Sequence, residues 1–261
     1  MSKSSKRNKF LTYYHKYFKY PASFQSLQVL NLSGNKFAGS LPKSLSCLVS
    51  LRQIKLYNNQ LEGQLPDVFS TCTALEEVNL SQNLFKGDPL EVFARCLSLK
   101  RLNLAYNRFD EDLNSSMLSG MTSLELLYLN HNQITGRIGP EICLLKGLKL
   151  LNVSNNRLIG MLPSAFGDLT RLEVCVMSAN EINGPVPASM SQLINLKDFH
   201  IFSQWPSEAH AVSREFKSYT YHRLYTAALQ LGLDTLCWKE YGMPAKGGKK
   251  QKHRKEISAD V

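Results

Sequence analysis

The chain has 261 residues, of which 43% are hydrophobic and 20% charged, and its formal net charge at pH 7 is +10. No run approaches the length of about 18 apolar residues that spans a membrane, and no apolar stretch follows the first bases. We therefore expect neither a membrane span nor a signal peptide. The excess positive charge lies at the two ends, because residues 27–241 carry as many bases as acids.

The first segment, residues 1–26, holds six Lys and Arg residues, no acid and a cluster of aromatic residues. Pro21 and Phe24 precede Leu27 at the spacing that two leucines keep before Leu51. We therefore predict a partial repeat that caps the apolar end of the region that follows. The basic, Ser-containing start also fits an organellar presequence, which stays an alternative.

Residues 27–204 repeat one pattern every 24 residues, with one unit of 25 residues. Apolar residues at positions 1, 4 and 6 of a unit predict a strand, and the Asn at position 9 stands where another buried side chain is expected. An unpaired buried amide costs about 1–3 kcal/mol, so each Asn needs backbone partners. We predict seven full units and a last strand, with the amides stacked in one structural ladder. The ladder residues are Asn35, Asn59, Asn83, Asn107, Asn132, Asn156 and Asn180.

The residues after each ladder Asn follow a second pattern, which indicates the type of repeat. A Gly usually follows four residues later, where a tight turn favours positive φ, and a Pro often follows three residues after that Gly. This pattern resembles the plant-type leucine-rich repeat, LxxLxLxxNxLxGxIP. The resemblance implies an α/β solenoid with a curved parallel sheet and an irregular, 3-10 or helical convex side. Unit four has Glu111 at the Gly position and one extra residue, so we expect a local bulge there.

Side chains at positions 3 and 5 of each unit are predicted to point outward from the concave sheet. They form a first outward column of Val29, Gln53, Glu77, Arg101, Leu126, Leu150, Val174 and Asp198. The second outward column consists of Asn31, Lys55, Asn79, Asn103, Tyr128, Asn152, Val176 and His200.

Units five to seven place several apolar side chains side by side in these columns. We call Leu126, Tyr128, Leu150, Val174 and Val176 the apolar cluster, and we predict that it binds protein, with His131 and His200 on or beside it. The alternative is that the C-terminal segment folds back over the cluster.

The C-terminal part is not a repeat. Residues 205–241 combine a helix N-cap residue, Ser207, with apolar residues at helical spacing, which predicts a helical cap for the open end of the solenoid. A separate docking helix is the alternative. Residues 242–261 are disordered by composition. We expect their bases to bind an acidic partner: Lys246, Lys249, Lys250, Lys252, Arg254 and Lys255.

Motifs for catalysis, metal binding or cofactor binding are not found, so we predict a protein that is not an enzyme and holds no cofactor. His131 and His200 lie three units apart, roughly 14 Å at the inter-strand spacing, which is too far to share a metal. Cys72, Cys96 and Cys175 occupy core positions, and buried free thiols suit a reducing compartment. Extracellular proteins of the type that this chain resembles usually carry Cys-paired caps.

The predicted function is a non-catalytic intracellular scaffold for protein–protein interaction, or a structural subunit of a larger cytoskeletal or axonemal assembly. We expect a cytoplasmic location, which includes the cytoskeleton or a flagellum, in preference to an organelle or the nucleus. The basic ends would add affinity for an acidic protein surface such as a microtubule. Two alternatives remain: a ribonucleoprotein or ribosome-associated subunit whose basic ends bind RNA, and a peptide or ligand recognition module like the plant receptors.

Overall fold

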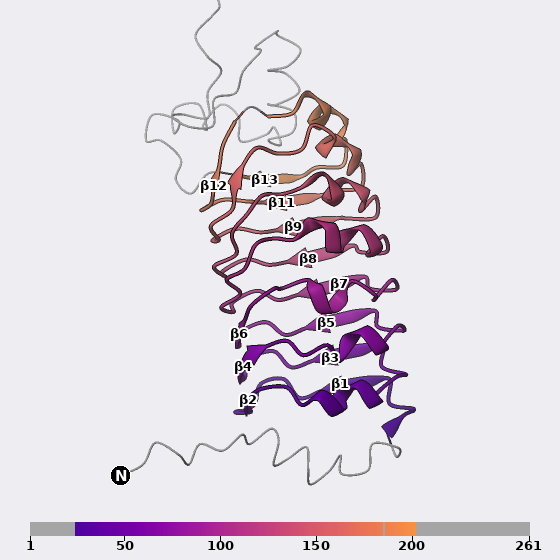
Figure 1. Ribbon diagram of the computed structural model, residues 1–261. Helices are drawn as coiled ribbons and strands as arrows, with labels where there is room; N and C mark the ends of the chain where they lie inside the picture. The colour runs from indigo at the N-terminus through magenta and orange to yellow at the C-terminus, as the bar shows by residue number, and fades with distance from the viewer. Residues whose placement is uncertain (1–23, 185, 202–261) are drawn as a thin grey trace, which may run out of the picture.

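The computed structural model describes residues 24–184 and 186–201, which form a stack of similar units along one axis (Figure 1). One strand from each unit joins a parallel sheet in the order β1-β3-β5-β7-β8-β9-β11-β13. The strands are β1 (Val29–Asn31), β3 (Gln53–Lys55), β5 (Glu77–Asn79), β7 (Arg101–Asn103), β8 (Leu126–Tyr128), β9 (Leu150–Asn152), β11 (Val174–Val176) and β13 (Asp198–His200). The predicted solenoid with a parallel sheet is confirmed.

The convex side consists of short 3-10 helices, one of the three forms predicted for it. They are η2 (Lys43–Cys47), η3 (Phe69–Thr71), η4 (Glu91–Phe93), η5 (Ser115–Gly120), η6 (Pro140–Leu144), η7 (Phe166–Asp168) and η8 (Ala188–Gln192). A 3-10 helix has three residues per turn, and its hydrogen bonds are poorly aligned. Such helices are therefore short, so the chain soon returns to the next strand. The predicted cap over 205–241, the tail over 242–261 and residues 1–23 lie outside the described residues.

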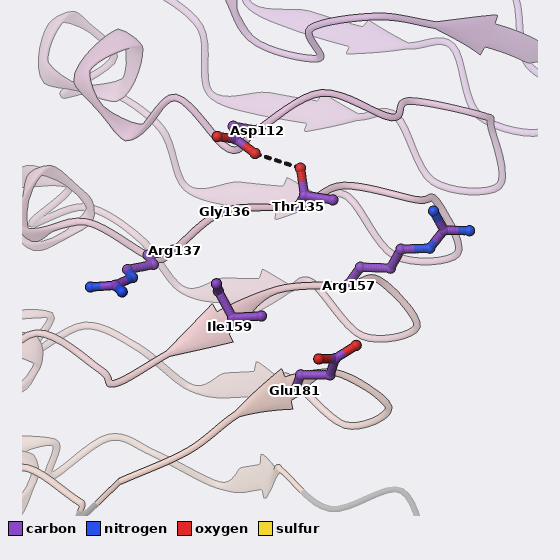
Figure 2. Close-up of a pocket in the computed structure, with 7 residues that line it drawn as sticks. All are labelled: Asp112, Thr135, Gly136, Arg137, Arg157, Ile159 and Glu181. Atoms are coloured by element: carbon purple, nitrogen blue, oxygen red, sulfur yellow. Dashed lines mark hydrogen bonds between the residues drawn. The ribbon is translucent and has the colours of Figure 1, made fainter.

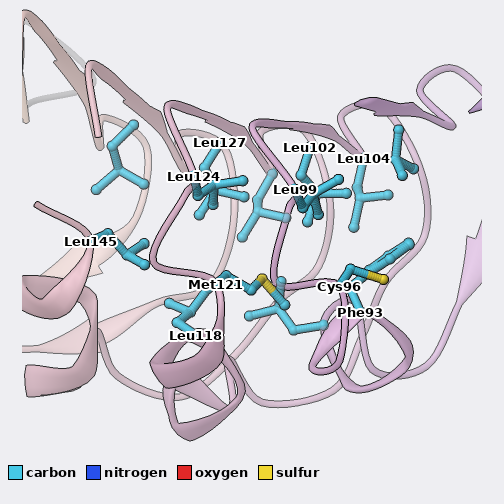
Figure 3. Packing of buried hydrophobic residues seen from close by; sticks show 14 of the residues in the cluster. Phe93, Cys96, Leu99, Leu102, Leu104, Leu118, Met121, Leu124, Leu127 and Leu145 are labelled. Carbon is cyan, nitrogen blue, oxygen red and sulfur yellow. The ribbon is translucent and has the colours of Figure 1, made fainter. Parts of the chain in front are cut away.

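The core is a continuous column of apolar side chains between the two sides. Figure 3 shows leucines of successive units packed against one another, with Phe93, Cys96 and Met121 closing the convex side. The ring centroids of Phe69 and Phe93 lie 4.9 Å apart. Since each unit exposes an apolar face to its neighbour, one unit alone has nothing to bury that face against, and the stack supplies it.

The ladder amides bind the backbone of two units at once. Asn107 is typical: its Nδ2 donates to the carbonyl oxygens of Leu80 and Leu104 at 3.0 and 3.1 Å, and its Oδ1 accepts from the N–H of Phe85 at 3.1 Å. The same pattern recurs at Asn59, Asn83, Asn132, Asn156 and Asn180.

Asn35 differs from the buried position that the pattern predicts. Its side chain is exposed, and its Nδ2 donates only to Leu32 and Ser33 of its own turn. The reason is its place in unit one, where no described unit stands on the preceding side to bury the amide.

A second parallel sheet, which the sequence did not indicate, runs beside the ladder in two pieces. The first piece contains β2 (Ala38–Gly39), β4 (Gln60–Gln64) and β6 (Leu84–Lys86), and the second contains β10 (Ile159–Gly160) and β12 (Glu181–Ile182). The gap falls at units four and five, where only isolated bridges remain, Asp112 to Thr135 and Arg137 to Ile159. In unit four, the Asp110 carboxylate accepts the N–H of Gly87 at 2.9 Å. A local bulge was expected in unit four, and what the structure shows there is an interruption of this sheet.

The residue before each ladder Asn adopts a left-handed backbone conformation. Six of them are not glycine and have φ of 55–56°: Asn58, Gln82, Tyr106, His131, Asn155 and Ala179. Such a conformation is unfavourable for residues with a Cβ and persists only where surrounding bonds hold it. Here the ladder amides hold the turn, and we call these residues, with Gly34, the turn column.

Candidate protein-binding face

The parallel register places equivalent residues of successive units opposite one another. Leu126 pairs with Leu150 and Leu150 with Val174, while Tyr128 lies opposite Asn152, which lies opposite Val176. These side chains point away from the core, and the residues between them, such as Leu127 and Leu151, are buried. The five residues of the apolar cluster are partly buried rather than fully exposed, because neighbours one strand apart cover one another.

Units two to four carry a charged network at the same two columns. Glu77 lies between two bases, with Lys55 Nζ at 3.0 Å from Oε1 and Arg101 Nη1 at 3.7 Å from Oε2. The side chain of Glu77 is 19% exposed, so its charge is largely covered by these partners. This part of the face is therefore polar, and its one acid is paired with two bases.

A third column, at position 2 of each unit, alternates in charge along much of the sheet. It consists of Gln28, Arg52, Glu76, Lys100, Glu125, Lys149, Glu173 and Lys197, and we call it the edge column. Its members form four ion pairs, Arg52–Glu76 at 2.6 Å, Lys100–Glu76 at 3.0 Å, Lys149–Glu125 at 2.7 Å and Lys197–Glu173 at 2.5 Å.

These ion pairs lower the pKa values of the three glutamates in the edge column. Hydrogen bonds from Lys100 and Arg52, the Lys100 bond being the larger cause, lower the pKa of Glu76 below its ordinary value. Hydrogen bonds from Lys149 and Lys197 lower the pKa of Glu125 and of Glu173 in the same way. The edge column therefore carries charges of both signs, and each of its acids is paired with at least one base.

Aromatic side chains gather where units four to six meet. The rings of Tyr106 and His131 stack at a centroid distance of 4.2 Å with an interplanar angle of 12°. His131 Nε2 lies 3.5 Å from Asn155 Nδ2, so the turn column continues into unit six. Because β8 ends at Tyr128 and His131 follows three residues later, this stack borders the apolar cluster. His200 occupies the second outward column opposite Val176, at the end of the described sheet.

A shallow pocket lies on another side of the solenoid, next to β10 and β12 (Figure 2). It is lined by Asp112, Thr135, Gly136, Arg137, Arg157, Ile159 and Glu181. Asp112 accepts a hydrogen bond from Thr135 Oγ1 at 2.5 Å, and Arg157 donates to Gln133 at 3.2 Å. Figure 2 shows the side chains of Arg137 and Arg157 directed to opposite sides, so they do not converge on one ligand.

Chemistry beyond binding has little support in the described residues. They contain no group of three or more His, Cys, Asp or Glu that could hold a metal, and no helix among them has the length and apolarity to cross a bilayer. Cys47, Cys72, Cys96, Cys143 and Cys175 are free thiols. Burial raises the pKa of the Cys96 thiol to about 12 and raises those of Cys72 and Cys175, so these thiols are protonated and unreactive at neutral pH.

Several candidate residues lie outside the described range. The bases predicted to contact an acidic partner are Lys246, Lys249, Lys250, Lys252, Arg254 and Lys255, all in the tail. Within residues 24–184 and 186–201 the chain carries 15 bases and 15 acids. The described solenoid is thus neutral overall.

Sequence reasoning missed three features of this face. The alternating charge of the edge column was readable as a sign change every 24 or 25 residues. The Tyr106–His131 stack was readable because both residues precede a ladder Asn. The third, the position of Asn130, had no sequence signal, because whether its buried amide is paired depends on atomic contacts.

Comparisons with known proteins place the repeats in a family. Residues 66–134 match one model described as Leucine rich repeat, and residues 26–48, 50–72 and 147–169 match another with the same description. A search of curated proteins finds no match.

Solved structures with similar repeats come from plants and bacteria. The ectodomain of the Arabidopsis thaliana membrane receptor kinase GASSHO1/SCHENGEN3, in complex with CASPARIAN STRIP INTEGRITY FACTOR 2, is 29% identical with a TM-score of 0.66. It matches 69% of this chain and 22% of that one. The plant peptide hormone receptor RGFR1 in complex with RGF2 is 29% identical with a TM-score of 0.65, over 69% of this chain and 28% of the receptor.

A bacterial protein gives a similar result. A leucine-rich repeat protein of Leptospira interrogans is 30% identical with a TM-score of 0.58, over 70% of this chain and 45% of that one. In all three comparisons, this chain spans less than half the length of the protein that it matches.

Proposed function

This chain is a leucine-rich repeat protein, and we propose that it is a non-catalytic scaffold whose protein partner docks on the concave face of units five to seven. The observation that carries the proposal is the apolar cluster. Its five outward side chains are only partly buried, whereas the charged outward residues of units two to four, Lys55, Glu77 and Arg101, are paired with one another. Covering apolar surface contributes roughly 25 cal/mol per Å², so this part of the face gains most from a partner.

A second candidate is recognition of an extended peptide, as part of the same binding role. Its support is the likeness to RGFR1, a peptide hormone receptor solved in complex with RGF2. Assignment of the repeats to the plant-type subclass belongs to this proposal and rests on the same likeness and on the Gly and Pro spacing. A peptide would use the apolar cluster as a protein partner does, and the two candidates differ in how much else of the sheet is covered.

We also propose that the basic ends add affinity for an acidic protein surface, such as that of a microtubule. The balanced charge of the described solenoid supports a role for the ends, since long-range attraction to acids has no other source in the chain. An RNA partner in a ribonucleoprotein is the alternative. We propose a cytoplasmic location, supported by the free thiols, and imaging of a fluorescent fusion in the source cell would overturn it by showing secretion.

The test is affinity purification of the full chain from its source cells, followed by mass spectrometry. A double variant, Leu150→Glu with Val174→Lys, puts opposite charges into the middle of the apolar cluster. Because both side chains point outward, we expect an unchanged circular dichroism spectrum and no recovery of the partners.

The matched control makes the same changes upstream, as Val29→Glu with Gln53→Lys. These residues occupy the same outward column in units one and two, so partner recovery should equal that of the unmodified protein. Equal recovery by the downstream variant would show that the apolar cluster is not the interface.

A further inference from the structure

Unit five lacks a side-chain pair that three other units have. In three units an Asn of the second outward column accepts a hydrogen bond from a Ser two residues later. The Oγ–Oδ1 distances are 2.6 Å for Ser33–Asn31, 2.7 Å for Ser81–Asn79 and 2.8 Å for Ser154–Asn152. These pairs show that side chains two residues apart lie on the same side here, and they leave the polar groups satisfied.

Unit five has Tyr128 and Asn130 at these two positions. The residue Asn130 is 7% exposed, and among the described residues its Oδ1 is the only buried side-chain oxygen or nitrogen with no hydrogen-bond partner. Its backbone is paired, since its carbonyl accepts the N–H of Tyr106 at 2.9 Å. A buried carboxamide oxygen without a hydrogen-bond partner is unfavourable, so its presence calls for an explanation beyond the stability of the unbound fold.

The surroundings of Asn130 are those of a contact surface. Tyr128 stands on the same side and belongs to the apolar cluster. His131 follows directly, and its ring stacks on Tyr106 of the preceding unit, whose side chain is 50% exposed. The unpaired carboxamide therefore lies next to exposed aromatic rings, at the upstream limit of the surface proposed to bind the partner.

We propose that Asn130 is a recognition residue, whose carboxamide oxygen accepts a main-chain N–H of an extended peptide segment held beside Tyr128 and Tyr106. This inference rests on the proposed function and adds a polar determinant to an apolar surface. The oxygen is covered in the unbound chain, so the proposal requires the carboxamide to rotate about its Cβ–Cγ bond, a torsion with broad minima. The occupant is a peptide segment because an extended main chain offers an N–H donor whatever its sequence, and the flanking rings cover the apolar part.

The first experiment uses random linear peptides displayed on phage and selected on the full chain, with counter-selection on the Leu150→Glu, Val174→Lys variant. The strongest selected peptide is synthesised, and its Kd is measured for Asn130→Ser, a change that installs the residue found in units three and six. We expect affinity to fall about tenfold, the equivalent of one hydrogen bond, with no loss of thermal stability. The control is Ser81→Ala, which removes a self-paired hydroxyl in unit three and should leave affinity unchanged.

The second experiment identifies the donor by methylating each peptide N–H in turn. One N-methyl position should weaken binding to the unmodified protein about tenfold and have no effect on Asn130→Ser, because the acceptor is then already lost. Unchanged affinity of Asn130→Ser, or an equal cost of methylation on both proteins, would leave Asn130 with a role in folding alone. If no selected peptide distinguishes the protein from its Leu150→Glu, Val174→Lys variant, the concave-face proposal itself fails.

Discussion

The upstream and downstream halves of the concave sheet share one backbone and differ in what their outward side chains do. In units two to four the outward columns are polar, and their charged residues Lys55, Glu77 and Arg101 bind one another. In units five to seven the same columns hold the apolar cluster, whose side chains form no ion pairs of this kind. The difference shows that the repeat dictates where a side chain points and leaves its chemistry free.

This separation between scaffold and surface arises because ladder residues and outward residues contact different neighbours. A buried ladder Asn bonds to backbone atoms of two units, so each unit with a unit before it depends on its Asn in the same way. An outward residue contacts only its lateral neighbours, so one half of the face is free to be polar and the other apolar. The following predictions test whether the two halves are equal in stability and unequal in binding.

The largest effect on stability is expected at the ladder. Asn107→Ala, in the upstream half, and Asn156→Ala, in the downstream half, should each lower the free energy of unfolding by roughly 1–3 kcal/mol, because backbone groups of two units lose their partner. Urea denaturation followed by circular dichroism gives the values. Similar losses in the two variants would show that both halves rest on the same scaffold.

Asn35→Ala is the matched control for that comparison. Its amide is exposed and bonds only within its own turn, so its removal should cost clearly less than the removal of Asn107. Unchanged midpoints for both buried ladder variants would contradict the structural role assigned to the amides.

The backbone and the outward columns were predictable because a constant period leaves little choice of register. Once Leu126 and Leu150 are aligned as equivalent residues, their pairing across neighbouring strands follows, and β8 and β9 have that register. The secondary structure of the convex side was less predictable, since a short apolar segment fits an irregular, 3-10 or helical conformation. The structure has 3-10 helices there. Asn35 shows the limit of reading burial from a repeat, because burial also needs a unit on each side.

Features that depend on contacts between particular side chains were not predictable. The network around Glu77 requires two bases to reach it from adjacent strands, which a pattern of residue types does not specify. The unpaired amide of Asn130 is visible only when every possible donor has been placed. The second sheet arises from Gly residues at positive φ that turn the chain back beside its neighbour, and the repeat showed the turns without the pairing.

A smaller effect is expected from the tail, and it separates attraction from selectivity. Deletion of residues 246–255 removes all six bases of the tail, so partner binding should weaken several-fold and depend less on salt. The set of recovered partners should stay nearly the same, because charge attraction does not select among acidic surfaces and the downstream half does. The measurement is affinity purification of both forms at low and at physiological salt.

Nuclease treatment tests whether the tail binds RNA instead of an acidic protein surface. An RNA partner predicts that nuclease removes the co-purifying proteins from the intact chain and that the salt dependence follows the number of phosphates neutralised. Partners that survive nuclease favour the acidic protein surface.

The smallest effect concerns the edge column, which runs through both halves and should behave alike in each. Ion pairing lowers the pKa of Glu76, Glu125 and Glu173 below 4.5, so the folded state binds fewer protons than the unfolded state in that range. Their contribution to stability is therefore complete above about pH 4.5 and is lost as the pH falls through the lowered values.

The triple variant Glu76→Gln, Glu125→Gln, Glu173→Gln should show a shallower loss of urea stability between about pH 6 and pH 3 than the unmodified chain. Because these side chains are partly exposed, added salt should narrow the difference. A steeper acid loss in the triple variant, or an effect that the single variant Glu76→Gln reproduces in full, would contradict ion pairs that act alike in both halves.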